Sequence, residues 1–410
     1  MKSTEKKHLS LPVQMLIGMV LGVAAGFLLK ENVGYISWIG SIFLRLLKMC
    51  VYPLVLLSII CGVANVMDIA RLKKIGLSFL GYTFISSGLA ALLGMLAMQL
   101  TKAGHGVNLG NAETGKTVDI GESLIEWFPD NIFASLSSGS LVQIIIFAIF
   151  FGVVLAAFRQ TAKGQRLYEI IESINDVITD MVGRVIKIAP LGVFSLVAGM
   201  IGTTSLDVVG GVMKMLLAYY VALAALLLII YPVILKLVGK VSPIQFYKNA
   251  FPTMIMAAST CSSAGTLPVT MKTAKERCGV PADIVNLVCA PAATINMDGA
   301  AIEYTCYVMF AAAAFNLNMS FGQLLFTIVL CVVMSAGAAG VPGGGIMMCT
   351  ICLTTMGLPD ETMVAIVAGI YILIDFVGTM VNVTSDTVGM VVIASNVNEL
   401  DRETFNKAND

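Results

Sequence analysis

The stretch SAGAAGVPGGG, from Ser335 to Gly345, interrupts a hydrophobic segment with small residues and a proline. A second stretch of this kind, STCSSAGTLP, runs from Ser259 to Pro268. Because glycine and proline weaken a helix interior, neither segment is expected to be a simple spanning helix. Each is followed by a long apolar helix, expected over roughly residues 282–312 and 361–395. Such paired interruptions indicate two inverted repeats whose flexible tips meet near the middle of a membrane.

The composition identifies lipid as part of the solvent. Hydrophobic residues make up 58% of the 410 residues and charged residues only 12%, against about 25% charged in soluble domains. Soluble, fibrous and disordered classes are therefore excluded. The nine cysteines lie almost entirely in apolar runs, so we expect buried, reduced side chains without a disulfide framework. Cys349 and Cys352 form a CxxC without a second pair or a histidine, which argues against a metal site.

Six further apolar windows precede the two interrupted segments, and a window of about 20 apolar residues predicts one membrane span. The windows are 11–30, 38–64, 75–101, 141–158, 183–201 and 211–235. Residues 167–187 alternate charged and apolar positions at helical spacing, which indicates an amphipathic helix leading into the fifth span. The prediction is an all-α polytopic membrane protein with eight transmembrane helices and two re-entrant helical hairpins.

The positions of the basic residues predict the orientation. Lys and Arg precede the first span and follow the second, fourth and sixth, and short loops rich in these residues are cytoplasmic. We therefore expect a protein of the cell membrane, the inner membrane in a bacterium, with both termini in the cytoplasm. Lys272 and Lys275 place the end of the first hairpin on that side, whereas the second hairpin enters from outside.

Four acidic side chains lie within the two long helices without a basic partner nearby. No Lys or Arg occurs between Arg277 and Arg402. The four are Asp298, Glu303, Asp375 and Asp386. An ionised carboxylate at membrane depth is costly, so either these groups are protonated or a cation from solution supplies the missing charge. The pattern predicts a site that couples transport to a cation.

The last helix sharpens this prediction, because four of its polar residues fall on one face at i, i+4, i+7 and i+11. These are Asp375, Thr379, Asn382 and Asp386. Thr294, Asn296 and Asp298 form a second polar cluster. Hard oxygen ligands suit Na+ and no soft metal. The alternatives are interhelical hydrogen bonds that only hold the bundle together, and a protonated or snorkelling Glu303.

Four segments resemble the signature segments of the dicarboxylate/amino acid:cation symporter family, the glutamate transporter-like proteins. They are TCSSAGTLPVTMKTAKE, NMDGA, GAAGVPGGG and DFVGTMVNVTSD, in the family's order over about residues 250–395. The resemblance implies a Na+-coupled symporter without an organic cofactor, not an enzyme. It also implies a homotrimer in membrane lipid that works by an elevator form of alternating access, in which a transport domain moves past a scaffold.

The resemblance also divides the chain. The scaffold and trimerisation helices would be residues 1–74 and 141–201, and the peripheral helices of the transport domain 75–101 and 208–238. The transport core would be 246–398, with hairpin 1, helix 7, hairpin 2 and helix 8.

Site residues follow from the same resemblance. Asp375 would bind the substrate amino group and Asn382 its carboxylate, together with Thr379. Atoms at the hairpin tips would close the pocket, and two further positions would line it. These are Ser263, Val341 and Gly345, with Ala300 and Gly378.

Three sodium sites are implied as well. The first would use Asn296 and Asp298 with Ser86, Ser87 and the Thr83 carbonyl. The second would use Asp386 with carbonyls of Ala292, Asn296 and Asn382, and the third carbonyls of Thr294, Ser335, Ala336 and Ala338.

Three departures from the family pattern bear on the substrate. Family members that carry acidic substrates have an arginine where this chain has Gly378, and Cys261 and Ala300 also differ from the pattern. Without a guanidinium, an acidic side chain would be buried unpaired. We therefore expect a small neutral amino acid such as serine, threonine or alanine, and we expect Gly378→Arg to favour acidic substrates. Gly378 and Ala300 should widen the pocket, so larger neutral or acidic substrates of the same family remain alternatives.

Glu303 lies one position before a glutamate that resembles a proton carrier in animal relatives, which leaves a proton role open. A cation or anion channel is the alternative from another class, because pores also use broken helices and carboxylates. An intramembrane aspartyl protease would need a GxGD-type segment, and none occurs. No nucleotide motif or nucleic-acid patch occurs either.

Overall fold

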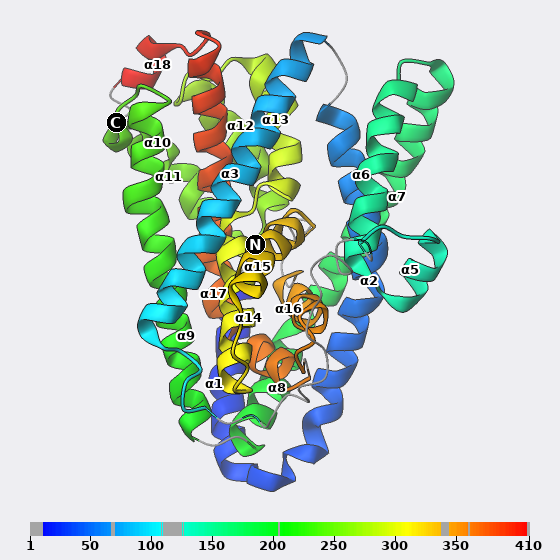
Figure 1. Cartoon of the computed structure of the whole chain (residues 1–410), viewed down its shortest axis with the longest axis vertical. Coiled ribbons are helices and arrows are strands. Elements are labelled where there is room, and N and C mark those ends of the chain that lie inside the picture. Colours follow the sequence, from blue (N-terminus) through cyan, green and yellow to red (C-terminus); the bar gives the residue numbers. More distant parts are fainter. Residues whose placement is uncertain are drawn as a thin grey trace, which may run out of the picture.

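The computed structural model describes residues 11–66, 70–107, 109, 125, 127–203, 206–337, 344–359 and 361–407. Within these residues every regular element is a helix, which confirms the predicted all-α class (Figure 1). The first half contains α1 (Leu11–Leu29), η1 (Lys30–Val33), α2 (Gly34–Val66), α3 (Ala70–Thr101), α5 (Ile132–Ser138), α6 (Leu141–Phe158), α7 (Ala162–Ile186), α8 (Ala189–Thr203), α9 (Leu206–Ala225), η2 (Leu226–Ile230) and α10 (Tyr231–Leu237). The second half contains α11 (Pro243–Thr260), α12 (Ser263–Glu276), α13 (Ala282–Ile295), α14 (Asp298–Ala314), α15 (Phe321–Ala336), α16 (Gly344–Thr355), α17 (Glu361–Asn396) and α18 (Arg402–Asn406).

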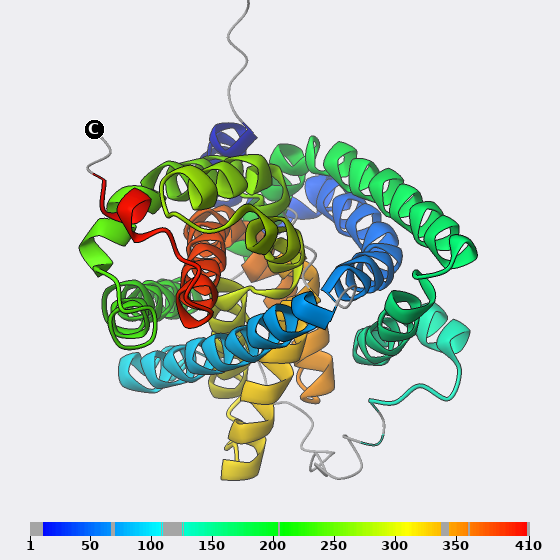
Figure 2. The same ribbon diagram turned by 90° about the horizontal axis from the view of Figure 1, so that it is seen from above.

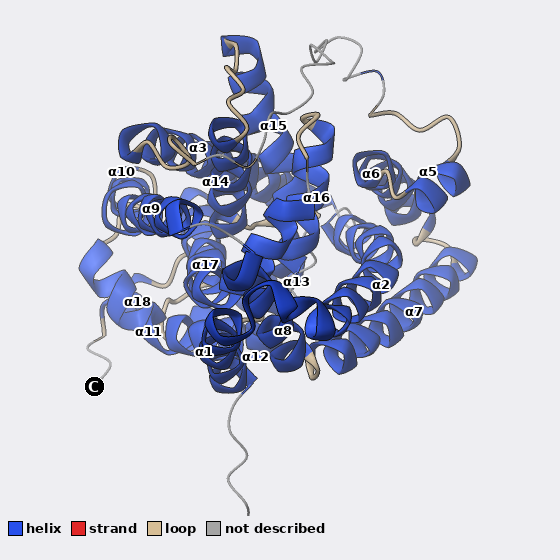
Figure 3. Cartoon of the chain, turned by 90° about the horizontal axis from the view of Figure 1, so that it is seen from below, coloured by secondary structure: helices blue, strands red, loops and turns tan. Residues whose placement is uncertain are grey.

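The helices form two groups that meet along α17. In one group α1 packs on α8, and α2 packs on α6, α7 and α8. In Figure 2, α2 and α7 form one flank of the molecule, and α3 crosses on the other. In the second group α3 packs on α9 and α14, and α11 packs on α12 and α17. Figure 3 shows α17 near the centre. Nearly all of α14 is buried, so α14 and α17 form the core.

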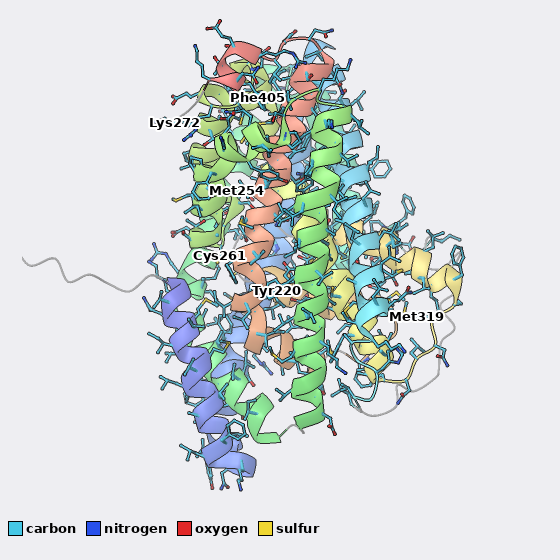
Figure 4. All side chains as sticks on the ribbon, turned by 90° about the vertical axis from the view of Figure 1, so that its left-hand side faces the viewer. Tyr220, Met254, Cys261, Lys272, Met319 and Phe405 are labelled. Carbon is cyan, nitrogen blue, oxygen red and sulfur yellow. The ribbon has the colours of Figure 1, made fainter. Side chains whose placement is uncertain are left out.

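Both interrupted segments are helical hairpins. In the first, the chain reverses at Cys261, whose φ of 50° lies in the left-handed region, and Ser262 then caps α12 by accepting a hydrogen bond from the Gly265 N–H. Figure 4 shows Cys261 near the middle of the long axis and Lys272 nearer one end. In the second hairpin α15 packs on α16, and residues 338–343 between them lie outside the described residues. Re-entry of the hairpins into a membrane stays a prediction.

The helix predicted over 282–312 is not continuous. It is broken into α13 and α14 at Asn296 and Met297, whose φ and ψ angles of −96° and 87°, and −127° and 71°, are not helical. Asparagine side chains compete with helical backbone hydrogen bonds, and the Asn296 amide donates to Asp386 on α17. The break places Asp298 in the first turn of α14, where the helix dipole favours a negative charge.

The other predicted spans correspond to helices. The helix predicted over 361–395 is α17, and the predicted amphipathic segment lies in α7. Among the described residues, three helices are each long and apolar enough to cross a membrane, at Ile75–Thr101, Asp207–Leu237 and Thr362–Asn396. A fourth crossing results if α7 and α8, which meet at 54°, count as one bent span. The total of eight crossings stays a prediction.

Candidate functional site

A small cavity lies where the first hairpin tip, the start of α16, the α13–α14 break and the middle of α17 converge. Seven of the eight residues predicted to bind substrate line it, and the eighth, Val341, lies outside the described residues. The complete lining is Cys261, Ser263, Met297, Ala300, Glu303, Tyr304, Gly344, Gly345, Tyr371, Asp375, Gly378, Thr379 and Asn382. The cavity has the convergent polar groups of a small-molecule site.

A larger depression, of about 940 Å³, lies on α7 and carries no comparable chemistry. Its lining residues all come from one helix and are mostly apolar or exposed: Arg166, Glu169, Ile170, Ser173, Ile174 and Val177. The cavity at the hairpin tips, with its buried polar side chains, is therefore the candidate site.

Three of the four residues of the polar stripe on α17 line this cavity: Asp375, Thr379 and Asn382. Thr379 donates from its hydroxyl to Asp375 Oδ1 at 3.1 Å. One turn further, Asn382 Oδ1 accepts the Gly299 N–H from the start of α14 at 2.7 Å. Because its oxygen is engaged, Asn382 has an NH2 group left to offer, which is a donor for a carboxylate. The site thus has a carboxylate for an ammonium group and an amide donor for a carboxylate.

Asp298 is fully buried and accepts hydrogen bonds from four hydroxyl groups. Ser86 and Ser87 on α3 donate to its Oδ1 at 3.0 and 2.8 Å. Tyr231 and Ser385 donate to its Oδ2 at 2.9 and 2.7 Å. Hydroxyl donors stabilise the charged form of a carboxylate. Asp298 therefore contacts Ser86 and Ser87 of α3, the residues expected to share a sodium site with it.

Tyr231 and Ser385 were not predicted. Ser385 immediately precedes Asp386 in the quoted motif, so its position was a usable signal. Tyr231 follows the π-helix η2, and nothing in the local sequence pointed to it. A π-helical turn shifts the helix face that follows it, and such turns are frequent at functional sites.

A buried hydrogen bond joins the end of α13 to α17. Asn296 Nδ2 donates to Asp386 Oδ1 at 2.8 Å, and both residues are buried. Within the described part of the chain, Asn296 Oδ1 and Thr83 Oγ1 are buried without a hydrogen-bond partner. Buried polar atoms are rarely left unmatched. Asn296 is bonded to the Asp386 carboxylate, and a free amide oxygen beside a carboxylate suits a hard cation such as Na+.

The remaining predicted sodium ligands bond within their own helices, and in the part of the chain that the structure describes they do not contact one another through hydrogen bonds. The Ala292 carbonyl accepts the Asn296 N–H at 2.9 Å. Thr294 bonds to the Pro291 carbonyl, and Ser335 bonds to the Val332 carbonyl. α13 contacts α15, but among the described residues no hydrogen bond joins Thr294 to Ser335. Ala336 ends α15, and Ala338 lies outside the described residues.

Glu303 is buried at the hairpin side of the cavity, and only 4% of it is exposed. Its Oε1 accepts the Tyr307 hydroxyl at 2.8 Å. Gly345 lies directly against it, since a Cβ there would be 2.0 Å from Glu303 Oε1, and the Gly345 N–H donates to Tyr371 Oη at 3.1 Å. Only glycine therefore fits at this position of α16.

The surface carries the ion pairs of the described residues. The pairs are Arg184–Asp180, Lys272–Glu276 and Lys407–Glu403, all on exposed side chains. In this part of the chain none involves Asp298, Glu303 or Asp386, as the absence of Lys and Arg between Arg277 and Arg402 predicts. All nine cysteines are free and buried, as expected.

Broken helices around buried carboxylates are typical of secondary transporters. The sequence model of the sodium:dicarboxylate symporter family matches residues 11–396, and the chain belongs to this family. A proton/sodium-glutamate symport protein of Bacillus caldotenax is 30% identical over 403 residues, which cover 95% of this chain and 94% of the relative. C4-dicarboxylate transport protein 2 of Bradyrhizobium sp. (strain ORS 278) is 27% identical over 405 residues, or 95% and 89% of the two chains. The family resemblance is confirmed, and the chain is a membrane symporter.

Proposed function

We propose that the protein is a Na+-coupled symporter of a small neutral amino acid such as serine, threonine or alanine. The main support is the charge of the cavity lining, which contains Asp375 and Glu303 but no Lys, Arg or His among the described residues. An acidic substrate side chain would meet two carboxylates and no cation. An unpaired buried charge costs about 3–5 kcal/mol, equivalent to two to three orders of magnitude in affinity.

The polar groups of the cavity match the constant part of an amino acid. Asp375 and Thr379 would hold the ammonium group, and the Asn382 amide would donate to the carboxylate. Ser263 on the first hairpin and Gly345 on the second would close the pocket, with Ala300 and Gly378 beside the substrate side chain. The convergence of these residues on one cavity supports this assignment.

Sodium would bind between the buried carboxylates and the α13–α14 break. The first site would use Asp298, Asn296 and the Thr83 carbonyl with Ser86 and Ser87, and the unmatched Asn296 Oδ1 supports it. The second would use Asp386 with carbonyls near it. Occupation of these sites would offset the negative charge of the core, so Na+ and substrate would stabilise each other's binding.

Transport would follow an elevator mechanism in a homotrimer with cytoplasmic termini. The scaffold would contain residues 1–74 and 141–201, the peripheral helices 75–101 and 208–238, and the transport core 246–398. The packing supports this division, because α1, α2, α6, α7 and α8 pack mostly on one another.

Uptake into proteoliposomes tests the proposal. A panel of radiolabelled serine, alanine, aspartate and succinate is offered with Na+, K+ and proton gradients set separately. We expect saturable, Na+-dependent uptake of the neutral amino acids. The names of the relatives favour glutamate or a dicarboxylate instead, and Na+-driven aspartate or succinate uptake would establish that alternative. Flux that does not saturate would indicate a channel.

A further inference from the structure

Tyr219 touches the wall of the candidate pocket from behind. It lies on α9 and is 1% exposed. Its hydroxyl donates to the Ile374 carbonyl of α17 at 3.2 Å, and the adjacent Tyr220 donates to the Leu373 carbonyl at 2.5 Å. The two tyrosines therefore hold the turn of α17 immediately before Asp375.

No side chain fits at position 378 while Tyr219 is in place. A Cβ on Gly378 would lie 2.5 Å from Tyr219 Oη, closer than real Cβ contacts, whereas ring carbon Cζ would be at an ordinary 3.8 Å. α17 cannot shift away easily, because Gly299 of α14 is packed so closely that its own Cβ would be 2.5 Å from the Gly378 carbonyl oxygen. The expectation that Gly378 widens the pocket is thus wrong, since the Tyr219 hydroxyl fills that volume. Gly378→Arg alone meets the same obstacle.

Tyr219 also packs behind the Glu303 side of the pocket. A narrow packing gap, too small for a water molecule, is lined by Tyr219, Ile374 and Glu303, among others. Glu303 lines the candidate substrate pocket as well. Tyr219 is therefore a large and rigid side chain directly behind this part of the pocket lining. Because interiors are close-packed, truncating such a side chain opens space that a ligand can enter.

We propose that Tyr219 is a specificity-determining residue of this pocket. Its hydroxyl takes the place of a side chain at position 378 and its ring closes the space behind Glu303, so the pocket admits only small substrate side chains. The inference rests on the proposed function, because it concerns the substrate class of the same site.

A double-mutant cycle tests the steric pairing with Na+-driven uptake of radiolabelled serine. Gly378→Ala should weaken the apparent affinity for serine about tenfold, because a clash in a packed core must displace Tyr219. Tyr219→Phe removes only the hydroxyl and should change the affinity less than about threefold alone. In the double variant we expect the affinity to return to within about threefold of the wild type. Equal effects of Gly378→Ala in both backgrounds would overturn the pairing.

A substrate panel tests the control of size. In Tyr219→Ala, valine and leucine should compete with serine about tenfold better than in the wild type, because the space left by the tyrosine ring can accept the larger side chain. Tyr220→Ala is the matched control, with the same truncation one residue away, and should leave the ranking unchanged. If Tyr219→Ala folds poorly, the double-mutant cycle of Gly378→Ala with Tyr219→Phe still tests whether Tyr219 shapes the pocket. An unchanged ranking in folded Tyr219→Ala contradicts the proposal.

Failure of the neutral-substrate proposal and failure of the Tyr219 proposal give different results. If the wild type takes up radiolabelled aspartate rather than serine, the neutral-substrate proposal is wrong. The same double-mutant cycle is then measured with aspartate uptake. If serine is transported but the variants behave additively, only the role of Tyr219 is wrong.

Discussion

At the scale of single residues, the buried carboxylates differ in how they are satisfied. Asp298 accepts four hydroxyl groups, whereas Asp386 accepts the Asn296 amide and Glu303 accepts the Tyr307 hydroxyl. A buried charge with few donors depends most on a mobile cation or proton. Asp386 is therefore the carboxylate at which removing charge should most directly report on cation coupling.

Asp386→Asn should weaken Na+ activation of uptake by about one to two orders of magnitude, because a carboxylate ligand to the cation is replaced by a neutral amide. Through linkage, the substrate affinity at fixed Na+ should fall as well. The measurement is the Na+ concentration for half-maximal serine uptake. Asp180→Asn is the control, since Asp180 is exposed and paired only with exposed Arg184. Wild-type Na+ dependence in Asp386→Asn would remove this residue from the cation site.

Gly345→Ala should abolish tight substrate binding while the protein still folds. The added methyl group would lie 2.0 Å from Glu303 Oε1 and 2.7 Å from the Tyr371 ring, so α16 could no longer approach the cavity. Overpacking of this kind costs about 1–3 kcal/mol. Gly88→Ala on α3 is the control, because a Cβ there meets open space. Serine protection against thermal unfolding measures the effect, and full protection in Gly345→Ala would contradict the assigned geometry.

At the scale of elements, regular patterns were predictable and local irregularities were not. Hydrophobic windows and the spacing of small residues predicted both hairpins and α17, because these follow from burial and helix periodicity. The break at Asn296 depends on a partner 90 residues away on α17. No local pattern carries that information.

The candidate site divides in the same way. Residues within the signature motifs could be assigned from sequence, and seven of them share one cavity. Tyr219 and Tyr231 could not, because both reach the site from α9 and α10 through packing that no motif records. The π-helix η2 between them sets their relative direction, and its Leu227 carbonyl is bonded by the Tyr247 hydroxyl.

Tyr231→Phe should weaken Na+ activation about threefold to tenfold, because Asp298 loses one of its four hydroxyl donors and becomes less well positioned as a ligand. Tyr220→Phe removes an equivalent hydroxyl from the same run of helix without touching a carboxylate, and should leave Na+ activation unchanged. Comparing the Na+ dependence of the two variants at saturating serine separates a positioning role from general packing. Identical behaviour would argue against a role for the π-helical turn.

At the scale of the whole molecule, the proposed motion must occur between the two helix groups. α2 meets α13 at this boundary, where a Cβ on Gly62 would lie 3.3 Å from the Ile295 side chain. Within the proposed scaffold, a Cβ on Gly22 of α1 would lie 2.8 Å from Val197 Cβ of α8. Both helix pairs are in close contact, but only the first would have to slide during transport.

Cross-linking distinguishes the α2–α13 contact from the α1–α8 contact, in a background where the nine native cysteines are replaced. Gly62→Cys with Ile295→Cys, once bridged by a short bifunctional methanethiosulfonate that forms a disulfide with each thiol, should abolish serine uptake while Na+-dependent serine binding in detergent persists, because the pocket lies within the transport core. Gly22→Cys with Val197→Cys should keep uptake within about twofold of its unbridged level, because both helices belong to the scaffold. Reduction should restore uptake in the first pair. Uptake that continues through a fully bridged α2–α13 pair would mean that the two groups do not slide past one another, and that access to the site alternates by movement of the hairpins alone.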